Sequence, residues 1–252
     1  MLHSSMRACV LLMALGLWTN GTGAARADIT TFDDGDGQWQ FSGAADIVPD
    51  GGNPGANMGF HAIDTFGVNV TNDSNPAFIG DVYRSPVTIG IDVRTDSITF
   101  RGNEVSRSLF VELRDTTTPN SQGLPWTSVF FELGTLSSST PGWVHYSVTI
   151  ADPTATGLPP GWVGYGAEDA NGNPILPPDR TFASVLENVD VINFTTFAPG
   201  FFYGFTNFDL AFDNLGVTPV PEPSACALLA GGLLGMLGAR RLRRRRRVDV
   251  GA

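Results

Sequence analysis

Val87-Thr88-Ile89-Gly90-Ile91-Asp92-Val93 is an unbroken alternation of branched apolar residues with small or polar ones. The four apolar residues share one face of an extended chain, and Thr88, Gly90 and Asp92 share the other. A period of two residues is typical of a β-strand that has one buried face. The stretch therefore predicts a strand whose apolar side packs on a core.

Four further stretches repeat this alternation, and Gly and Pro are abundant between them, as turns require. No stretch of ten or more residues in the same region has a convincing helical period. We therefore predict an all-β fold, an antiparallel two-sheet β-sandwich of the jelly-roll kind. The additional predicted strands are centred on residues 109–114, 129–133, 144–150 and 208–212.

The predicted sandwich occupies residues 28–218, which is long enough for one domain with a sizeable core. The chain has 15 cationic side chains, all arginine, and 25 acidic ones. Outside this domain lie nine of the arginines but only two of the acids, Glu222 and Asp249. The domain thus has six arginines against 23 acids, a formal charge of −17. Such a surface repels nucleic acids and anionic lipids and suits divalent cations or simple solubility. Because Cys9 and Cys226 both lie outside the domain, it has neither a disulfide nor a thiol nucleophile.

The first 27 residues predict a secretory signal peptide. Arg7 supplies a weak positive start, residues 8–18 form a short apolar run, and Ala25 and Ala27 are small residues at the two key positions of a cleavage site. The alternative, a retained membrane helix, is weaker because the apolar run is shorter than the roughly 20 residues that a span requires.

The C-terminal region, residues 219–247, has three parts, followed by a short tail at 248–252. Pro221, Glu222 and Pro223 come first, and their prolines interrupt any strand or helix. An apolar run at 225–239 follows, short for a bilayer-spanning helix. A basic block comes last; its arginines favour the cytoplasmic side of a membrane, and they are Arg240, Arg241, Arg243, Arg244, Arg245, Arg246 and Arg247.

This order of Pro-Glu-Pro, apolar helix and arginine cluster resembles the PEP-CTERM sorting signal of Gram-negative bacteria. The resemblance covers about thirty residues at the end of the chain. It implies handling by an exosortase, transient tethering to the inner membrane, and release to the cell surface or to an extracellular, exopolysaccharide-rich biofilm matrix. The alternative is an ordinary tail anchor with a basic stop-transfer flank.

The two ends and the middle of the domain carry a second resemblance. The domain opens with Phe-Asp-Asp-Gly-Asp-Gly-Gln-Trp at 32–39, contains Gly-Trp-Val-His-Tyr at 142–146, and closes with Phe-Asp-Asn-Leu-Gly-Val at 212–217. These short motifs resemble those of galactose-binding-like β-jelly rolls, a superfamily that includes many carbohydrate-binding modules. A concanavalin-like sandwich is the alternative.

That resemblance implies a structural calcium ion between the first and last strands. Asp33 or Asp34 and Asp213 are the matching ligands, with Asp209 and Asp36 as possible additions. Calcium takes six to eight oxygen ligands in flexible geometry, which carboxylates and the carbonyl groups of a glycine-rich turn supply. The alternative is an acidic turn beside a solvated strand edge.

Residues 151–180 are predicted to form a long proline-rich loop, and Val48–Gly59 a shorter one rich in Gly and Asn. Trp162 and Tyr165 lie in the longer loop. Their rings suit stacking against a sugar, and they equally suit plugging the loop onto the sandwich.

Signals for catalysis are sparse. His61 and His145 are the only histidines of the domain, and no Gly-x-Ser-x-Gly or His-Glu-x-x-His motif accompanies them. Glu112 and Glu132 fall on neighbouring predicted strands, where a pair of carboxylates is what glycoside hydrolysis needs. Three hypotheses follow: a non-catalytic surface or matrix protein that binds glycan, a structural or adhesive protein that binds another protein, and, as the weakest, a polysaccharide hydrolase.

Overall fold

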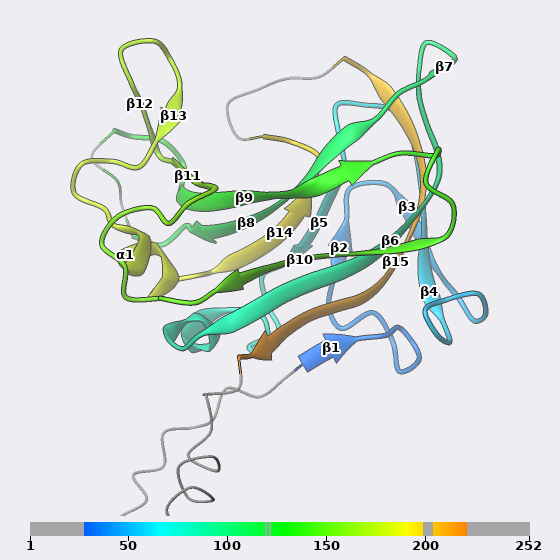
Figure 1. Cartoon of the computed structure of the whole chain (residues 1–252), viewed down its shortest axis with the longest axis horizontal. Helices are drawn as coiled ribbons and strands as arrows, with labels where there is room; N and C mark the ends of the chain where they lie inside the picture. Colours follow the sequence, from blue (N-terminus) through cyan, green and yellow to red (C-terminus); the bar gives the residue numbers. More distant parts are fainter. Residues whose placement is uncertain (1–27, 119, 121, 199–203, 221–252) are drawn as a thin grey trace, which may run out of the picture.

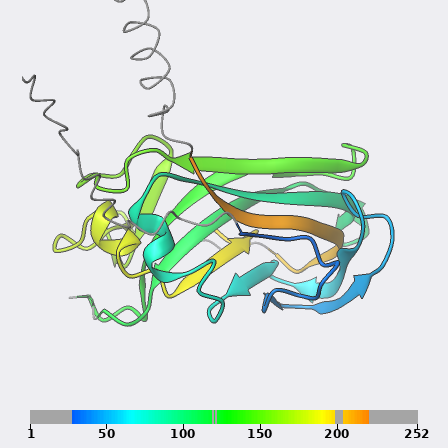
Figure 2. The ribbon, with the colours of Figure 1, turned by 90° about the horizontal axis from the view of Figure 1, so that it is seen from below.

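The computed structural model describes residues 28–118, 120, 122–198 and 204–220. Strands dominate this part of the chain, and they form two antiparallel sheets packed face to face (Figures 1 and 2). The prediction of an all-β, two-sheet antiparallel sandwich is confirmed. No helix among the described residues is long and apolar enough to cross a membrane.

The seven-stranded sheet is ordered β10-β6-β15-β4-β3, with β1 added to β15 and β7 added to β6. Its central strands, β6 and β15, are the longest of the fold. The bounds are β1 Asp28–Thr30, β3 Ala44–Val48, β4 Asn57–Thr65, β6 Val87–Phe100, β7 Asn103–Glu104, β10 Trp143–Ile150 and β15 Thr206–Pro219.

The six-stranded sheet is ordered β11-β9-β8-β14-β5-β2. A small hairpin, β12–β13, one 3-10 helix, η1, and one short α-helix, α1, complete the described fold. The bounds are β2 Gln40–Phe41, β5 Asn69–Asn72, β8 Arg107–Asp115, β9 Thr127–Leu136, β11 Trp162–Tyr165, β12 Ala167–Glu168, β13 Pro174–Ile175, β14 Val191–Thr195, η1 Gly80–Arg84 and α1 Phe182–Leu186.

The apolar faces predicted from the alternation form much of the core between the sheets. In β6, Val87, Ile89 and Ile91 are fully buried, and Phe208 and Phe212 of β15 pack in the same core. This burial removes apolar surface from water, which is the main favourable term in folding. The aromatic layer continues through Trp39, whose ring lies 5.1 Å from that of Phe78.

The two ends of the described chain meet on one strand. Asp28, Ile29 and Thr30 pair antiparallel with residues 215–217 of β15, as Figure 2 shows. We predicted that the first strand of the domain lies beside its last strand, and this is confirmed. The pairing falls a few residues closer to the C-terminus than the predicted partner segment at 208–213.

The two predicted loops are shorter than expected because strands occupy their ends. Strands β3 and β4 extend into the first, so only residues 49–56 remain as a connection, which we call loop 49–56. The second contains β11, which pairs with β9, and the β12–β13 hairpin. Cross-strand pairing thus overrides the local preference of Gly and Pro for turns.

Candidate functional site

Asp213, a predicted calcium ligand on β15, is fully buried and anchors loop 49–56. One of its carboxylate oxygens accepts a hydrogen bond from the backbone N–H of Asn53 (2.5 Å), and the other accepts one from the N–H of Asn214 (2.7 Å). Burial raises the pKa of this carboxyl group, and the negative charges of Asp92 and Asp33 raise it further. Asp213 therefore acts as a buried acceptor for backbone donors.

Asp92, on β6, was not predicted as a site residue and lies beside Asp213 in the strand register. Its Oδ2 atom accepts from the side-chain amides of Asn53 (2.9 Å) and Asn214 (2.7 Å). Its Oδ1 atom lies 2.6 Å from Nδ1 of His145 on β10. Asp92 is on the outer face of the sheet, as its place in the alternation predicts, yet it is only 4% exposed because these partners cover it.

Loop 49–56 also reaches the opening segment of the domain. Asp33 is exposed, and its Oδ1 atom accepts from the backbone N–H of Ala56 (2.9 Å). The carbonyl of Gly51 accepts from Arg94 and from the indole of Trp143, both at 3.2 Å. The loop therefore bridges acids from the start, the middle and the end of the domain through its own N–H groups.

The four predicted calcium ligands do not converge. Asp34 is exposed, and Asp209 lies in a separate groove, described below. Among the described residues, no group of three or more His, Cys, Asp or Glu side chains is arranged to hold a metal ion. The oxygens of Asp213 face N–H donors, which is the opposite of what a cation requires. The side chains as placed do not fit the ion, so the calcium staple stays a prediction without a matching ligand set here.

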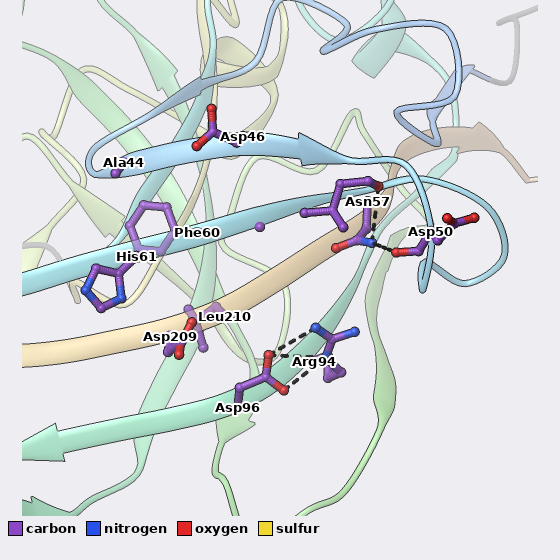
Figure 3. A pocket seen from close by; sticks show the side chains of 12 residues that line it. Ala44, Asp46, Asp50, Asn57, Phe60, His61, Arg94, Asp96, Asp209 and Leu210 are labelled. Atoms are coloured by element: carbon purple, nitrogen blue, oxygen red, sulfur yellow. Dashed lines mark hydrogen bonds and ion pairs between the residues drawn. The ribbon is translucent and has the colours of Figure 1, made fainter.

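The groove that contains Asp209 lies on the outer face of the seven-stranded sheet and has a volume of about 300 Å³. Figure 3 shows Asp209 between His61 of β4 and Asp96 of β6, and Asp96 is paired with Arg94 at 3.0 Å. Asp46 of β3 also lines the groove. Asp209 is thus exposed on the outer face of β15, which lies between β6 and β4 rather than at a sheet edge.

A denser polar and aromatic site lies on the six-stranded sheet. We call it the Glu112 cluster; it consists of Glu112, Arg114, Trp126, Ser128, Tyr165 and Asn193. Its members come from β8, β9, β11, β14 and the residue before β9, so pairing of four neighbouring strands brings them together. All of them lie on the face opposite the core residues Leu113 and Val129.

Glu112 is 1% exposed, and both of its oxygens are engaged. Oε1 accepts from the hydroxyl of Ser128 (2.7 Å) and the indole N–H of Trp126 (3.2 Å). Oε2 accepts from Nε of Arg114 (2.8 Å) and lies 2.6 Å from its Nη2. Four donors thus hold this buried carboxylate group in a fixed position.

Two aromatic rings lie at the solvent side of this ion pair. The guanidinium of Arg114 lies 4.7 Å from the ring centroid of Trp126, and the Trp126 ring lies 5.7 Å from that of Tyr165. Both aromatic side chains are partly exposed. Burial raises the pKa of the Tyr165 phenol, and the charge of Glu112 adds to that effect. The phenol therefore remains a neutral hydrogen-bond donor and acceptor at any physiological pH.

The amide of Asn193 completes the cluster. It lies between Arg114 and Asn69, and with its oxygen toward Arg114 it accepts a hydrogen bond of 2.7 Å from Nη2. Amide orientation is assigned from such partners. In this orientation the Asn193 nitrogen donates to the carbonyl of Phe194 at 3.2 Å.

The structure separates the two aromatic residues predicted as glycan contacts. Trp162 is 7% exposed, and its ring packs on Phe131 and Phe182 at 5.5 and 5.1 Å. This placement corresponds to the second interpretation of Trp162, a side chain that plugs its segment onto the sandwich. Tyr165 is partly exposed within the Glu112 cluster, and no sequence pattern predicted that Trp126 is its neighbour.

Glu132 and Glu112 lie on adjacent strands and on the same face, as predicted, but they are not directly opposed. Glu112 faces Phe130 in the register, and Glu132 faces Phe110. The rings of these two phenylalanines contact edge to face at 6.1 Å. With Glu112 held by Arg114, the pair does not present two free carboxyl groups to a sugar.

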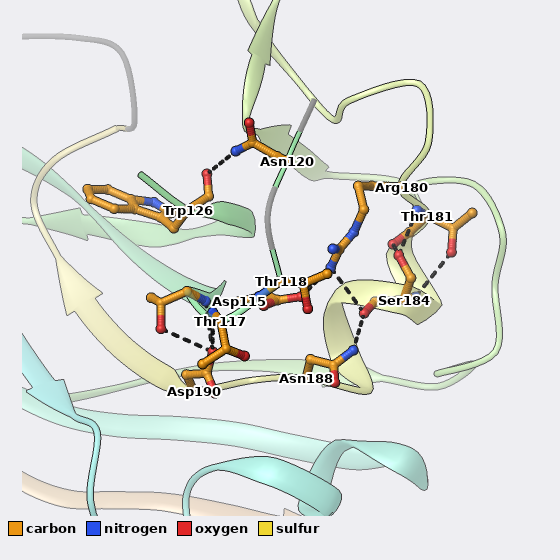
Figure 4. A network of polar contacts seen from close by, with 11 residues as sticks. Asp115, Thr117, Thr118, Asn120, Trp126, Arg180, Thr181, Ser184, Asn188 and Asp190 are labelled. Carbon is orange, nitrogen blue, oxygen red and sulfur yellow. Dashed lines mark hydrogen bonds and ion pairs between the residues drawn. The ribbon is translucent and has the colours of Figure 1, made fainter. Parts of the chain in front are cut away.

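The backbone that carries Trp126 is anchored from beneath. Asp190 accepts hydrogen bonds from the N–H groups of Thr116 (2.8 Å) and Thr117 (3.0 Å), and Asn120 donates to the carbonyl of Trp126 (3.3 Å). Figure 4 shows these contacts beside a second anchor, the buried ion pair of Arg180 with Asp115. The segment after β8 is thus held at several points before it presents Trp126.

The predicted terminal segments lie outside the described residues. These are the cleavage-site residues Ala25 and Ala27, and the sorting residues Pro221, Glu222, Pro223, Arg243, Arg244 and Arg245. The described chain ends at Val220, whose N–H donates to the carbonyl of Pro86 (2.9 Å). The first two residues of the predicted segment 219–247, Pro219 at the end of β15 and Val220, therefore still contact the sandwich.

No protein-family model and no curated protein matches the chain. Among solved structures, a family 11 carbohydrate-binding module from Clostridium thermocellum, in complex with a β-1,3-1,4-mixed-linked tetrasaccharide, aligns with 13% identity and a TM-score of 0.48 over 78% of this chain and 97% of that one. The CBM22-1 xylan-binding domain from Paenibacillus barcinonensis Xyn10C aligns with 10% identity and a TM-score of 0.41 over 77% and 96%. An exo-β-agarase aligns with 11% identity and a TM-score of 0.44 over 77% of this chain and 26% of its own. At these identities and scores the similarities carry no argument about ligand or activity.

Proposed function

We propose that this chain is an exported, non-catalytic cell-surface or matrix protein whose sandwich binds a polysaccharide at the Glu112 cluster. The observation that carries the proposal is the grouping of two partly exposed aromatic rings with a fixed ion pair. Sugars are bound by stacking of their apolar faces on aromatic rings and by directional hydrogen bonds from neighbouring polar groups. Trp126 and Tyr165 supply the first component, and Arg114 with the Tyr165 phenol supplies the second.

The state of Glu112 favours binding over hydrolysis. A glycosidase needs one carboxyl group that gives up a proton and a second that acts as base or nucleophile. Glu112 has both oxygens occupied by four donors, so it orients its neighbours instead. A glycan-binding role uses the residues in this state without any rearrangement.

A second candidate is an adhesive function toward another protein. Phe66 and Phe205 contact each other at 4.4 Å, and their side chains are 43% and 54% exposed. Large exposed apolar residues that gather in a patch are typical of interaction surfaces. This candidate requires the aromatic pair, not the Glu112 cluster, to carry binding.

Export and sorting are part of the proposal. The signal-peptide pattern at 1–27 and the Pro-Glu-Pro, apolar and arginine order at 219–247 support passage across the inner membrane, a transient tether and processing by an exosortase. Mass spectrometry of protein released from its native host tests this. The expected product lacks residues 1–27 and most of the chain after Pro223; released protein that retains Arg240–Arg247 contradicts it.

A polysaccharide-binding screen of the whole chain tests the binding function. Trp126→Ala is expected to weaken binding to a polysaccharide that the wild-type chain retains by about tenfold or more. Trp143→Ala is the matched control, since Trp143 is also partly exposed but lies on the other sheet. Unchanged binding by Trp126→Ala contradicts the Glu112 cluster as the binding site, and a wild-type chain that retains none of the polysaccharides favours the adhesive alternative.

A further inference from the structure

A second, smaller hollow lies on the outer face of the seven-stranded sheet, away from the Glu112 cluster. Gly90 of β6 and Gly216 of β15 are paired in the register and form its floor. It has a volume of about 260 Å³, and we call it the glycine trough. Its other lining residues are Ile29, Thr88, Asp92, His145, Asn214 and Thr218.

One wall of the trough is a histidine whose ring is fixed. Nδ1 of His145 lies 2.6 Å from Oδ1 of Asp92, which is buried. A Cβ atom on Gly90 would lie 3.0 Å from Cε1 and 3.3 Å from Nε2 of that ring. The imidazole therefore lies over Gly90, with its Nε2 edge at the trough, and the absence of a side chain at position 90 makes this placement possible.

The same wall contains an amide that is equally fixed. Asn214 has a positive φ of 51° and donates to Asp92 and to the carbonyl of Asn53. Asp92 thus orients both His145 and Asn214 from a buried position. Side chains held by such partners lose little further freedom on binding, which is the physical meaning of preorganisation.

The opposite wall is made of hydroxyl groups and one apolar side chain. Thr88 contacts Thr149 through their hydroxyls at 2.9 Å, and Thr218 reaches the carbonyl of Thr88 at 3.4 Å. Ile29, on the short first strand, is 48% exposed beside them. The trough therefore combines a flat floor, an apolar edge and hydrogen-bonding groups at both ends.

We propose that the glycine trough binds a single uncharged sugar unit. A pyranose ring offers one apolar face and a rim of hydroxyls, which match Ile29 and the glycine floor on one side and His145 and the threonines on the other. The formal charge of −17 on residues 28–218 disfavours uronic acids and other anions. The hydroxyl-binding groups come from both ends of the trough, and its volume is near the lower limit of ordinary ligand sites, about 300 Å³.

The position of the trough has a consequence for the matrix. The outer faces of two packed sheets point away from each other, so the trough and the Glu112 cluster lie on opposite sides of the sandwich. If the cluster binds polysaccharide, as we propose above, one molecule contacts two glycan chains and links them. This second step rests on the proposed function; the sugar site itself does not.

Backbone amide NMR of the whole chain tests the site with four probes: the methyl glycosides of glucose, galactose, mannose and N-acetylglucosamine. A weak site with a dissociation constant near 1 mM is about 90% filled by roughly 10 mM ligand. We expect at least one glycoside to shift the amide signals of Gly90 and Gly216. His145→Gln should weaken that binding about tenfold, the effect of one lost hydrogen bond, whereas His61→Gln, which changes the other exposed histidine of the same sheet, should leave it within twofold.

Each other outcome overturns the proposal. If none of the four glycosides shifts Gly90 and Gly216, or if the shifts survive in His145→Gln, the trough is not a sugar site. If signals move only at Trp126 and Tyr165, the proposed function stands and the trough does not contribute to it. For the linking step, wild-type chain should precipitate a soluble polysaccharide that it binds, and His145→Gln should bind that polysaccharide without precipitating it.

Discussion

Nη2 of Arg114 lies 2.6 Å from Oε2 of Glu112, two residues earlier on the same strand. Residues i and i+2 of a strand point to the same face, so β8 itself brings the two charges together. The pairing holds the guanidinium 4.7 Å from the ring centroid of Trp126, and Trp126 and Tyr165 are both partly exposed. It also determines the first prediction.

Arg114→Ala should lower the free energy of unfolding by about 3 kcal/mol, because it leaves the Glu112 carboxylate buried without its partner. Urea unfolding of the two chains measures this. Arg84→Ala is the control: Arg84 pairs with Asp81 on the surface, where both side chains are more than half exposed. That change should cost no more than about 0.5 kcal/mol. Equal effects of the two substitutions would contradict the buried ion pair.

Asp190 should act as a positioning residue for Trp126. Asp190→Ala removes the acceptor of the Thr116 and Thr117 N–H groups, so the segment before Trp126 loses its fixed geometry. We expect about a tenfold loss of polysaccharide affinity, with partial recovery in Asp190→Asn, which keeps one acceptor oxygen. Isothermal titration calorimetry measures both.

The control for that experiment is Asp152→Ala. Asp152 is an exposed acid that accepts from the N–H of Thr154 in the same way, on the connection between β10 and β11. A loss of affinity in Asp152→Ala as large as in Asp190→Ala would mean that neither acid acts through Trp126.

The raised pKa of Asp213 makes stability depend on pH. The carboxyl group of Asp213 stays protonated in the folded chain at pH values where the same group in the unfolded chain, with its ordinary pKa of 3.8, has lost its proton. In that window the free energy of unfolding falls as pH rises. The stabilisation that Asp213 contributes is therefore fully present below pH 3.8 and is lost as pH rises through the pKa of Asp213 in the folded chain. Wild-type chain should therefore gain stability relative to Asp213→Asn as pH falls from neutral toward 3.8. A stability difference that is constant over this range would show that Asp213 does not titrate differently on folding.

The contacts of loop 49–56 predict that the ends of the domain are joined without a cation. Asn53→Ala removes the amide donor to Asp92. It should lower the free energy of unfolding by about 1–3 kcal/mol. Each kcal/mol lowers the Tm of a domain of this size by about 2–4 °C. The shift should be equal in calcium and in chelator. The control Asn103→Ala, on the short exposed strand β7, should leave Tm unchanged.

A calcium-dependent Tm would contradict that prediction. If calcium raises the Tm of the wild-type chain but not that of Asp213→Ala, then the staple first expected from Asp33 and Asp213 exists. The hydrogen bonds of Asn53 would then be an arrangement that the ion replaces.

The alternation in residues 87–93 predicted the strand and its buried face correctly, because side-chain period is a local property. It also predicted that Asp92 faces outward. It did not predict that Asp92 is buried, since its cover comes from Asn53, Asn214 and His145, which are distant in sequence. Local patterns contain no information about which loop folds back over a strand.

The residues of the Glu112 cluster were predicted only in part for the same reason. Tyr165 was identified from its ring, but the same argument selected Trp162, which pairing with Phe131 turns into the core. Within a strand, residues 162 and 165 have opposite parity, so a strand prediction for this segment would have separated them. The abundance of proline in 151–180 prevented that prediction. Trp126 could not be distinguished from other tryptophans, because its neighbours Arg114 and Tyr165 come from other strands.

Calorimetry of the whole chain, of Trp126→Ala and of Trp143→Ala with a polysaccharide that the wild-type chain retains measures directly whether the Glu112 cluster binds glycan. Loss of one stacking ring should weaken binding by about tenfold or more, while Trp143→Ala stays within about twofold of wild type. Equal affinities for wild type and Trp126→Ala would contradict the central claim that the Glu112 cluster binds glycan.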